Sequence, residues 1–274
     1  PTPVLPERAP SKFQAESAMP RLDKSRDSIE QDLDALEVKF DSAVSELKSL
    51  KDKLKVARDS RERAMKRAWA DLDHKWLTIV LAAATFFCIL SFYVYSAMGQ
   101  RFDSRPLPHG ADPLLALLPL WDMVPVLTYG WLVVHLTAWY TWVVYEPRRI
   151  PYFLGTIGLF VLVRTLFVAL NPVGAPLGMI NLNASYLLSP LRGVLAFDNE
   201  FFFSGHTAVP FLYFLFSTYP WYRRFFLAAS VVMGASVLLS RNHYTIDVLG
   251  AFFMTYGIFA LSRRLLGFLD PTEQ

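Results

Sequence analysis

The chain contains almost no cysteine, and charged residues are scarce beyond its first seventy positions. Its single cysteine, Cys88, lies within an apolar run, so no intramolecular disulfide can form and the redox compartment cannot be inferred. Nothing before residue 76 resembles a cleavable signal peptide, so we expect internal segments to direct insertion. Hydrophobic residues, 53% of the total, are concentrated into runs too long for an ordinary soluble domain. The composition therefore favours a membrane protein with a separate, charged N-terminal region.

The N-terminal region predicts a polar tail followed by a long helix. Residues 1–20 contain five prolines and few apolar side chains, so we expect a disordered tail. In residues 21–75 apolar side chains recur alternately four and three positions apart, which predicts a coiled coil leading into a basic juxtamembrane helix. This heptad stripe consists of Ile29, Leu33, Leu36, Phe40, Ala43, Leu47, Leu50, Leu54 and Ala57. We expect the stripe to join copies of the chain into a homo-oligomer; a lone amphipathic helix, or one folded against the membrane, is the alternative.

Six apolar segments between residues 76 and 268 are candidates for crossing about 30 Å of hydrocarbon, which takes about twenty helical residues. They are 76–98, 124–144, 151–170, 207–218, 225–239 and 246–266. If the N-terminus is inside, arginine pairs follow the even-numbered spans, as basic residues do in cytoplasmic loops. These pairs are Arg148–Arg149, Arg223–Arg224 and Arg263–Arg264. The sequence thus predicts an all-α fold, with a six-helix membrane bundle at 76–268, a short tail at 269–274, and both termini in the cytoplasm.

Two short polar motifs stand at the outer ends of predicted spans four and six. The first, Ser204-Gly-His-Thr207, follows the aromatic run 201–203. Ser204 can cap a helix N-terminus, and Gly205 lets backbone N–H groups approach a ligand closely, so together they favour an anion site. His206 is expected to project into that site. A helix cap with an incidental histidine is the alternative reading of this motif.

The second motif, His243-Tyr-Thr-Ile-Asp247, begins span six. A spacing of four places the imidazole and the carboxylate on one helix face, where they can form a hydrogen bond. A carboxylate on one ring nitrogen fixes the tautomer and leaves the other nitrogen to act as a nucleophile or base. Such pairs are also common as purely structural features. The presence of both motifs at one membrane depth favours the functional interpretation.

Arg164 is a charge within span three, about thirteen residues from the inner start of that span. At about 1.5 Å per residue it lies roughly 20 Å from the inner boundary, near the predicted level of His206 and His243. A guanidinium at this depth can hold a phosphate through two parallel hydrogen bonds. The alternative is a structural arginine whose side chain extends to the interface.

With these residues the sequence resembles the sphingomyelin synthase-like branch of the type 2 phosphatidic acid phosphatase (PAP2) superfamily. Phe203-Ser-Gly-His-Thr207 and His243-Tyr-Thr-Ile-Asp247-Val-Leu-Gly-Ala251 are similar to the last two signatures of that branch. Residues 148–172, which include Arg164, are more weakly similar to an earlier one. The resemblance covers residues 76–266 and leaves out the predicted coiled coil.

Two departures from the family pattern leave the substrate open. Asp198-Asn-Glu200 stands where the branch has Cys-Gly-Asp, so Glu200 keeps the acidic character without the cysteine. Only Asn242 separates Arg241 from His243, whereas phosphatases of the wider superfamily place five residues in the corresponding interval. The pattern is therefore closer to the synthase branch than to those phosphatases.

The resemblance implies an enzyme that needs no metal or other cofactor. In that family the histidine of the last motif, oriented by the aspartate, attacks phosphorus, while the other histidine protonates the leaving group. Carried over, His243 is the nucleophile, Asp247 orients it, and His206 is the acid and then the base. The residues expected to bind the substrate phosphate are Arg164, Ser204, Gly205 and Thr207. Supporting roles are expected for Glu200, Tyr244 and Arg241.

The expected substrate is a membrane phospholipid, attacked through a phosphohistidine at the extracytoplasmic or lumenal face. With water as acceptor the enzyme is a lipid phosphate phosphatase or a hydrolase of phospholipase C type; with ceramide or diacylglycerol as acceptor it is a headgroup transferase. Nucleic acid is not an expected partner. Two readings from other classes are a membrane scaffold that recruits partners through the coiled coil, and a transporter whose polar path includes His135 and Arg164.

Overall fold

The computed structural model describes residues 19–70, 74–103, 107–171, 173–181 and 202–270. All secondary-structure elements in these parts are helices, so the predicted all-α class is confirmed for the described residues. The chain divides into two compact units, Pro1–Ala64 and Met65–Gln274. The predicted disordered tail lies outside the described residues, except that Met19 and Pro20 already belong to the first helix.

Helix α2 spans Met19–Ala70, and its residues 19–64 form the described part of the first unit. Its 52 residues extend about 78 Å at 1.5 Å per residue. Six apolar residues of the heptad stripe are between 50% and 70% exposed: Leu33, Leu36, Phe40, Leu47, Leu50 and Leu54. The predicted helix is thus present and carries an apolar face that the single chain leaves open to solvent. Pairing of copies, which would make α2 a coiled coil, stays a prediction.

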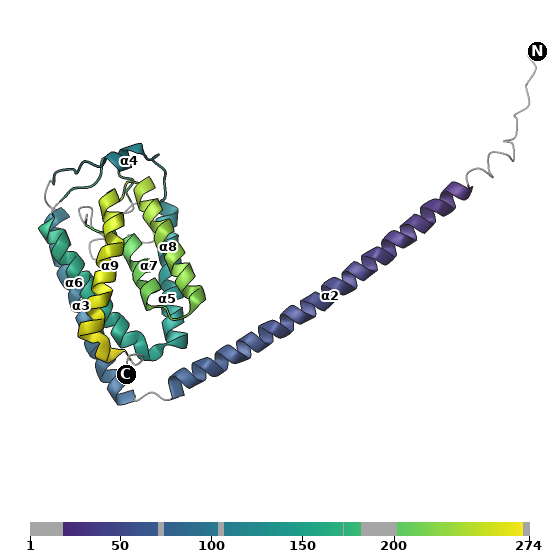
Figure 1. The fold of residues 1–274 in the computed structure, drawn as a ribbon, viewed down its shortest axis with the longest axis horizontal. Coiled ribbons are helices and arrows are strands. Elements are labelled where there is room, and N and C mark those ends of the chain that lie inside the picture. Colours follow the sequence, from purple (N-terminus) through teal and green to yellow (C-terminus); the bar gives the residue numbers. More distant parts are fainter. Residues whose placement is uncertain (1–18, 71–73, 104–106, 172, 182–201, 271–274) are drawn as a thin grey trace, which may run out of the picture. The chain divides into compact units, whose positions relative to one another are not determined.

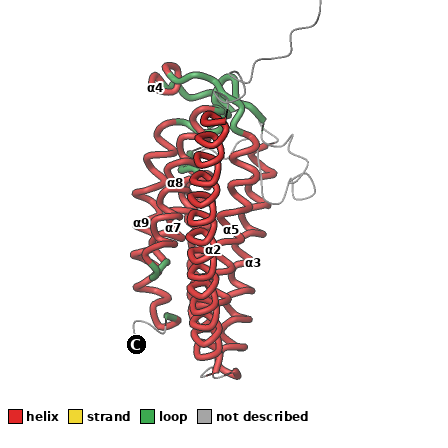
Figure 2. The backbone as a smooth tube through the Cα atoms, turned by 90° about the vertical axis from the view of Figure 1, so that its right-hand side faces the viewer, coloured by secondary structure: helices red, strands yellow, loops and turns green. Residues whose placement is uncertain are grey.

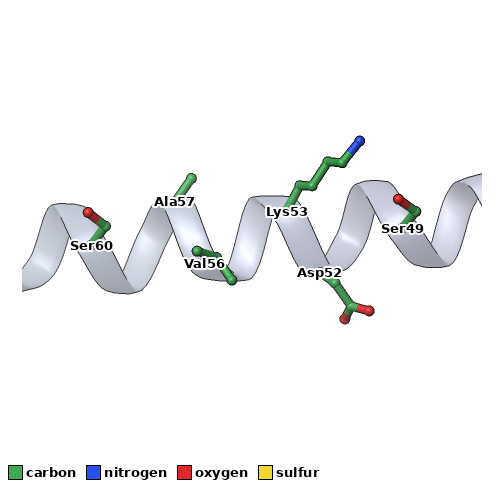
Figure 3. A pocket seen from close by; sticks show the side chains of 6 residues that line it. All are labelled: Ser49, Asp52, Lys53, Val56, Ala57 and Ser60. Carbon is green, nitrogen blue, oxygen red and sulfur yellow. The ribbon is translucent and has the colours of Figure 1, made fainter.

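The surface of α2 contains a shallow hollow. Figure 3 shows the side chains that line it, which all project from consecutive turns of the same helix. They are Ser49, Asp52, Lys53, Val56, Ala57 and Ser60. Because these walls come from one helix, the hollow is a feature of the helix surface and not an enclosed ligand site.

Each of the six predicted spans coincides with a helix of the second unit (Figure 1). The helices are α3 (His74–Asp103), α5 (Trp131–Tyr145), which follows the π-helical turn η1 (Val126–Gly130), α6 (Ile150–Leu170), α7 (Gly205–Phe216), α8 (Pro220–Leu239) and α9 (Thr245–Leu266). Four of them, α3, α6, α8 and α9, are long and apolar enough to cross a membrane, which indicates an integral membrane protein. Helix α7, with 12 residues, extends only about 18 Å, and α5 is also short for a full crossing. Six crossings therefore stay a prediction.

The helices of the second unit run alongside one another, and Figure 2 shows the loops around α4 (Pro113–Leu117) gathered at one end. We call this the site end, because α7 and α9 begin there. Helix α3 packs against α6, and α7 packs against α8 and α9. Gly158 brings α6 close to α3, since a Cβ at this position would lie 2.7 Å from Cδ1 of Phe87. Small residues at such crossings let apolar helices pack closely without a hydrophobic driving force between them.

The interior combines aromatic rings with hydroxyl groups, several of which form hydrogen bonds within their own helix. The ring of Trp142 lies 3.6 Å from that of Phe153 and 5.0 Å from that of Tyr213, centroid to centroid. Buried Thr156 and Thr165 on α6 donate their hydroxyl hydrogens to the carbonyl four residues earlier, at 2.9 Å and 2.7 Å. Such bonds let polar side chains lie inside an apolar helix without leaving a donor unsatisfied.

A buried ionic cluster closes the end opposite the site end. The Arg149 guanidinium donates Nε and Nη2 to the two carboxylate oxygens of Asp270, at 3.2 Å and 3.0 Å. Its Nη1 donates to Glu146 and to the Phe216 carbonyl, both at 3.0 Å. The predicted tail at 269–274 therefore begins with packed residues, because Leu269 and Asp270 are buried. Arg149 is also buried, and its hydrogen bonds connect the start of α6 with the end of α7 and with Asp270. Its place in an arginine pair suggests instead a solvated charge in a loop.

Candidate functional site

The first predicted motif forms the N-terminus of α7. Ser204 is the N-cap, and its Oγ accepts a hydrogen bond from Thr207 N at 3.4 Å. Its carbonyl accepts from Ala208 N at 2.9 Å, which starts the helical ladder. The predicted cap is confirmed. His206 follows two residues after the cap and is half-buried in the first turn of the helix. The free end of a helix dipole and its N–H groups thus lie beside an imidazole, which is an arrangement that attracts anions.

The second motif forms the N-terminus of α9, and it holds the predicted dyad. Nδ1 of His243 lies 3.3 Å from Oδ2 of Asp247, and both side chains are buried. The same carboxylate oxygen accepts the Tyr244 backbone N–H at 3.0 Å. The predicted contact between imidazole and carboxylate is therefore present. This contact with Asp247 engages Nδ1 of the His243 ring.

A single peptide unit joins the two motifs to Arg164. The carbonyl of Phe203 accepts a hydrogen bond from Arg164 Nε at 3.3 Å. The N–H of Ser204, in the same peptide unit, donates to the Asp247 carbonyl at 3.0 Å. Phe203 reaches this geometry with φ of 33°, a left-handed conformation that is strained for an aromatic residue. The start of α7 is thus attached to α6 on one side and to α9 on the other.

The buried Arg164 side chain lies at the N-terminus of α7, as the depth estimate from sequence predicts. A Cβ added to Gly205 would lie 4.0 Å from Arg164 Nε, which is an ordinary contact distance and places the guanidinium beside the helix end. Its guanidinium carbon lies 5.7 Å from the ring centroid of Tyr95 on α3. Arg164 also interacts electrostatically with Asp247. One positive charge therefore stands beside both motifs.

His206 lies in an aromatic and basic environment. Its ring is 4.7 Å from that of Trp131 on α5, and Trp131 is in turn 4.4 Å from His135, centroid to centroid. His206 interacts electrostatically with His243, Arg164 and His135. Nδ1 of His135 is taken up by the Trp131 carbonyl at 2.9 Å. The two predicted histidines and the predicted arginine thus converge on one region at the site end.

Thr207 is placed differently from the rest of its motif. Its hydroxyl is fully buried and has no hydrogen-bond partner, and a Cβ added to Gly234 on α8 would lie 3.3 Å from it. Its carbonyl accepts the Ser230 hydroxyl at 2.7 Å. The side chain of Thr207 therefore faces α8, and the contribution it can make to an anion at the helix end comes from its backbone. Its role in binding phosphate stays a prediction.

The three predicted supporting residues have different placements. Tyr244 is buried beside the dyad, and its hydroxyl forms hydrogen bonds with two loops, described below. Arg241 has φ of 54° and donates Nη1 to the Leu177 carbonyl at 3.1 Å, so it is engaged with a loop at the site end. Glu200 lies outside the described residues.

Sequence reasoning missed two parts of this region. Trp131 lies between His206 and His135, but within an apolar helix a tryptophan gives no signal of its own. Asp112 was also missed, although its position before Pro113 is the usual sequence of an N-cap followed by proline. Among the described residues, no group of three or more His, Cys, Asp or Glu side chains is arranged to hold a metal ion.

Comparison with known proteins supports the family resemblance for the C-terminal part of the chain. Residues 199–264 match the family model described as PAP2 superfamily C-terminal. This segment contains both motifs, from Ser204 to Asp247, while Arg164 lies before it. The match supports the PAP2 superfamily in general and does not resolve its sphingomyelin synthase-like branch. No curated protein matches the chain.

Proposed function

We propose that the chain is an integral membrane enzyme that transfers or hydrolyses a phospholipid headgroup through a phosphohistidine at His243. The observation that carries this proposal is the attachment of the His243–Asp247 dyad to the start of α7 by the bond from Ser204 N to the Asp247 carbonyl. This attachment brings His243 close to a helix N-terminus and to the cation of Arg164, which supports His243 as the nucleophile. The match of residues 199–264 to a PAP2 family model supports the same chemistry.

In the first step, Nε2 of His243 attacks phosphorus and forms a P–N bond, while the P–O bond to the lipid breaks. His206 gives a proton to the departing oxygen, which leaves as a lipid alcohol. The phosphoryl oxygens gain charge during this step. We assign the stabilisation of that charge to Arg164 and to the N–H groups at the start of α7, which lie close to one another. Asp247 holds the imidazole and stabilises its positive charge after attack.

In the second step, a hydroxyl attacks phosphorus, the P–N bond breaks, and His206 accepts the hydroxyl proton. Water as the incoming group gives a lipid phosphate phosphatase, or a hydrolase of phospholipase C type. A lipid alcohol such as ceramide or diacylglycerol gives a new headgroup lipid, which is the sphingomyelin synthase-like outcome. Both outcomes use the same first step, so His243 and His206 are required whichever acceptor enters.

We also propose the membrane arrangement that the sequence predicts. In this arrangement both termini are cytoplasmic, the site end faces the extracytoplasmic or lumenal side, and α2 joins two or more copies of the chain. The alternating arginine pairs support the orientation. The exposed heptad stripe of α2 supports self-association.

The test is product analysis with purified chain reconstituted in mixed phospholipids together with ceramide and diacylglycerol. Free phosphate identifies a phosphatase, a released phospho-alcohol identifies a hydrolase, and a new headgroup lipid identifies a transferase. We expect His243→Ala to lower turnover on the order of a thousandfold or more, because the nucleophile is removed. We expect His206→Ala to lower it by about 10²- to 10⁴-fold, which is the usual contribution of a general acid.

His74→Ala is the matched control, since it replaces a histidine outside both motifs and should retain wild-type turnover. Phosphate bound to His243 should be detectable by mass spectrometry after a short incubation with a labelled lipid. A His243→Ala protein that keeps full turnover of every lipid, with correct folding, contradicts the proposal.

A further inference from the structure

Two loops at the site end are tied to the first turn of α9 by three side chains that the proposed reaction does not use. Asp112 belongs to the loop before α4, and Tyr244 and Thr245 stand at the N-terminus of α9. Asp112 and Thr245 are 133 positions apart in the sequence. We call these three residues the loop clamp.

Asp112 connects α4 to α9 through one carboxylate. Its Oδ1 accepts the N–H groups of Leu114 and Leu115 at 3.1 Å and 2.9 Å, and so caps α4. Its Oδ2 accepts Thr245 N at 2.6 Å, and the Thr245 hydroxyl donates to Oδ1 at 3.2 Å. Partial burial raises the pKa of Asp112, but the bonds from Leu115 and Thr245 outweigh this and lower it below the ordinary value. The carboxylate is therefore charged, and able to accept all these bonds, at neutral pH.

Tyr244 connects α9 to both loops through one hydroxyl. The hydroxyl donates to the Gly174 carbonyl and accepts from Gly110 N, both at 2.9 Å. Burial raises the pKa of Tyr244, and the nearby Asp247 and Asp112 raise it further, so the hydroxyl stays protonated and can donate. The two loops also bond to each other, from Gly174 N to the Pro108 carbonyl at 2.9 Å.

His243 lies between anchored neighbours on both sides. Before it, the Asn242 side chain donates to the Ile180 carbonyl at 3.0 Å and to the Ser240 hydroxyl at 2.8 Å. After it, Tyr244 and Thr245 belong to the loop clamp. The backbone that carries the imidazole is therefore fixed from the loops as well as by its own helix.

We infer that the loop clamp is a positioning device for His243: by fixing Tyr244 and Thr245 on the loops, it holds the imidazole against Asp247 with Nε2 directed at the phosphate. This inference rests on the proposed function. Asp112 and Thr245 contribute geometry rather than a reacting group. Loss of the clamp should therefore slow the reaction of bound lipid more than it weakens binding, because small misplacements of a nucleophile cost rate.

The decisive variant is Asp112→Asn in the full-length chain. The asparagine keeps the size and can still accept the N–H groups of Leu114 and Leu115 through its oxygen, but its NH₂ group opposes Thr245 N. We expect kcat to fall by about tenfold to a hundredfold while KM changes less than about twofold. The control is Asp122→Asn, which alters an exposed carboxylate that accepts a hydrogen bond from Val124 N in its own loop at 3.0 Å. Its kcat should stay at the wild-type value.

Tyr244→Phe is the second variant, because it removes one hydroxyl and both of its bonds. Amide hydrogen exchange distinguishes a local effect on the position of His243 from a loss of stability throughout the bundle. We expect faster exchange in residues 243–248 of both clamp variants and unchanged protection in residues 207–216 of α7. Tyr129→Phe, which alters an exposed tyrosine, is its control.

The outcomes separate the clamp from the reaction. If His243→Ala abolishes turnover and both clamp variants keep wild-type kcat, the positioning role is wrong and the proposed function stands. If both variants lose protection in α7 as well as α9, the three residues hold the whole bundle together and the positioning role is again wrong. If His243→Ala keeps full turnover, the proposed function fails first.

Discussion

The two units of this chain are both helical, yet they use apolar residues in opposite ways. On α2, apolar residues form one narrow stripe and are half or more exposed. In the helices of the second unit, apolar residues occur on all sides, and those of the core are almost completely buried. An apolar stripe shows which face of a helix is suited to packing. In a helix that is apolar on all sides, the apolar pattern does not show which face packs against its neighbours.

In the second unit, polar residues mark which faces are inside. Serine and threonine are rarer than leucine in α6, α8 and α9, and each of these helices buries one or more of them. Examples are Thr165, Ser230 and Thr255. Arg164 follows the same rule, since it is the charge within α6 and it points to the start of α7. The comparison teaches that apolar spacing locates the exposed apolar face of α2, while the sparse polar residues locate the interior of the bundle and the candidate site.

The largest expected effect on kcat comes from an Asp→Asn substitution in the second unit, compared with the same type of substitution in the first. Asp247→Asn keeps the shape of the side chain but presents the wrong hydrogen-bonding group to His243 Nδ1, and so disturbs its tautomer. We expect kcat to fall by about 10²- to 10⁴-fold, by analogy with the effect of this change in a catalytic triad. Asp59→Asn on α2 should leave kcat unchanged. Equal activity of the two variants, measured by the lipid product assay, would remove the functional contrast between the units.

An intermediate effect, on stability rather than turnover, is expected from Arg149→Met. The substitution leaves Asp270 and Glu146 without their buried cation, which typically costs about 3–5 kcal/mol. The thermal unfolding midpoint in detergent should fall markedly, while turnover per folded molecule stays near the wild-type value because the cluster lies at the end opposite the site. Arg58→Met, an exposed change on α2, should not alter the midpoint. A midpoint unchanged by Arg149→Met would mean that the ionic cluster does not hold this end together.

The smallest effect on turnover is expected from introducing charged residues into the heptad stripe. Leu47→Glu combined with Leu54→Glu should abolish self-association, because both residues stand at core positions of the predicted coiled coil. Turnover should change by less than about twofold. Oligomeric state is measured by light scattering of the detergent-solubilised chain.

The matched control for this variant is Val38→Glu combined with Val56→Glu. These valines are 71% and 65% exposed but lie off the stripe. Their replacement by glutamate therefore adds the same charge to the same helix without changing the stripe. Self-association that survives both double variants would assign the oligomer to other surfaces. A wild-type chain that is monomeric at all concentrations would leave α2 as a lone amphipathic helix.

Much of the site could be predicted from the sequence because its elements are local. The cap at Ser204 and the pair His243–Asp247 each lie within one helical turn, where spacing determines contact. Arg164 could be placed by counting residues along a helix. The family match over residues 199–264 coincides with the two motifs on which the sequence prediction depends.

The remaining features depend on contacts between distant parts of the chain. Arg149 meets Asp270 across 121 positions, and its pairing with Arg148 made it look like a loop charge. Asp112 meets Thr245 across 133 positions, and spacing within either segment gives no sign of this. The sequence predicts span four at 207–218, whereas α7 runs from Gly205 to Phe216 with Ser217 as its C-cap, and apolar periodicity does not define these ends.

The peptide unit between Phe203 and Ser204 has a mechanical consequence. A peptide plane is rigid, so its carbonyl and its N–H cannot rotate separately. Because the carbonyl is bonded to the Arg164 side chain of α6 and the N–H to the backbone of α9, rotating this rigid unit to improve one bond also changes the geometry of the other.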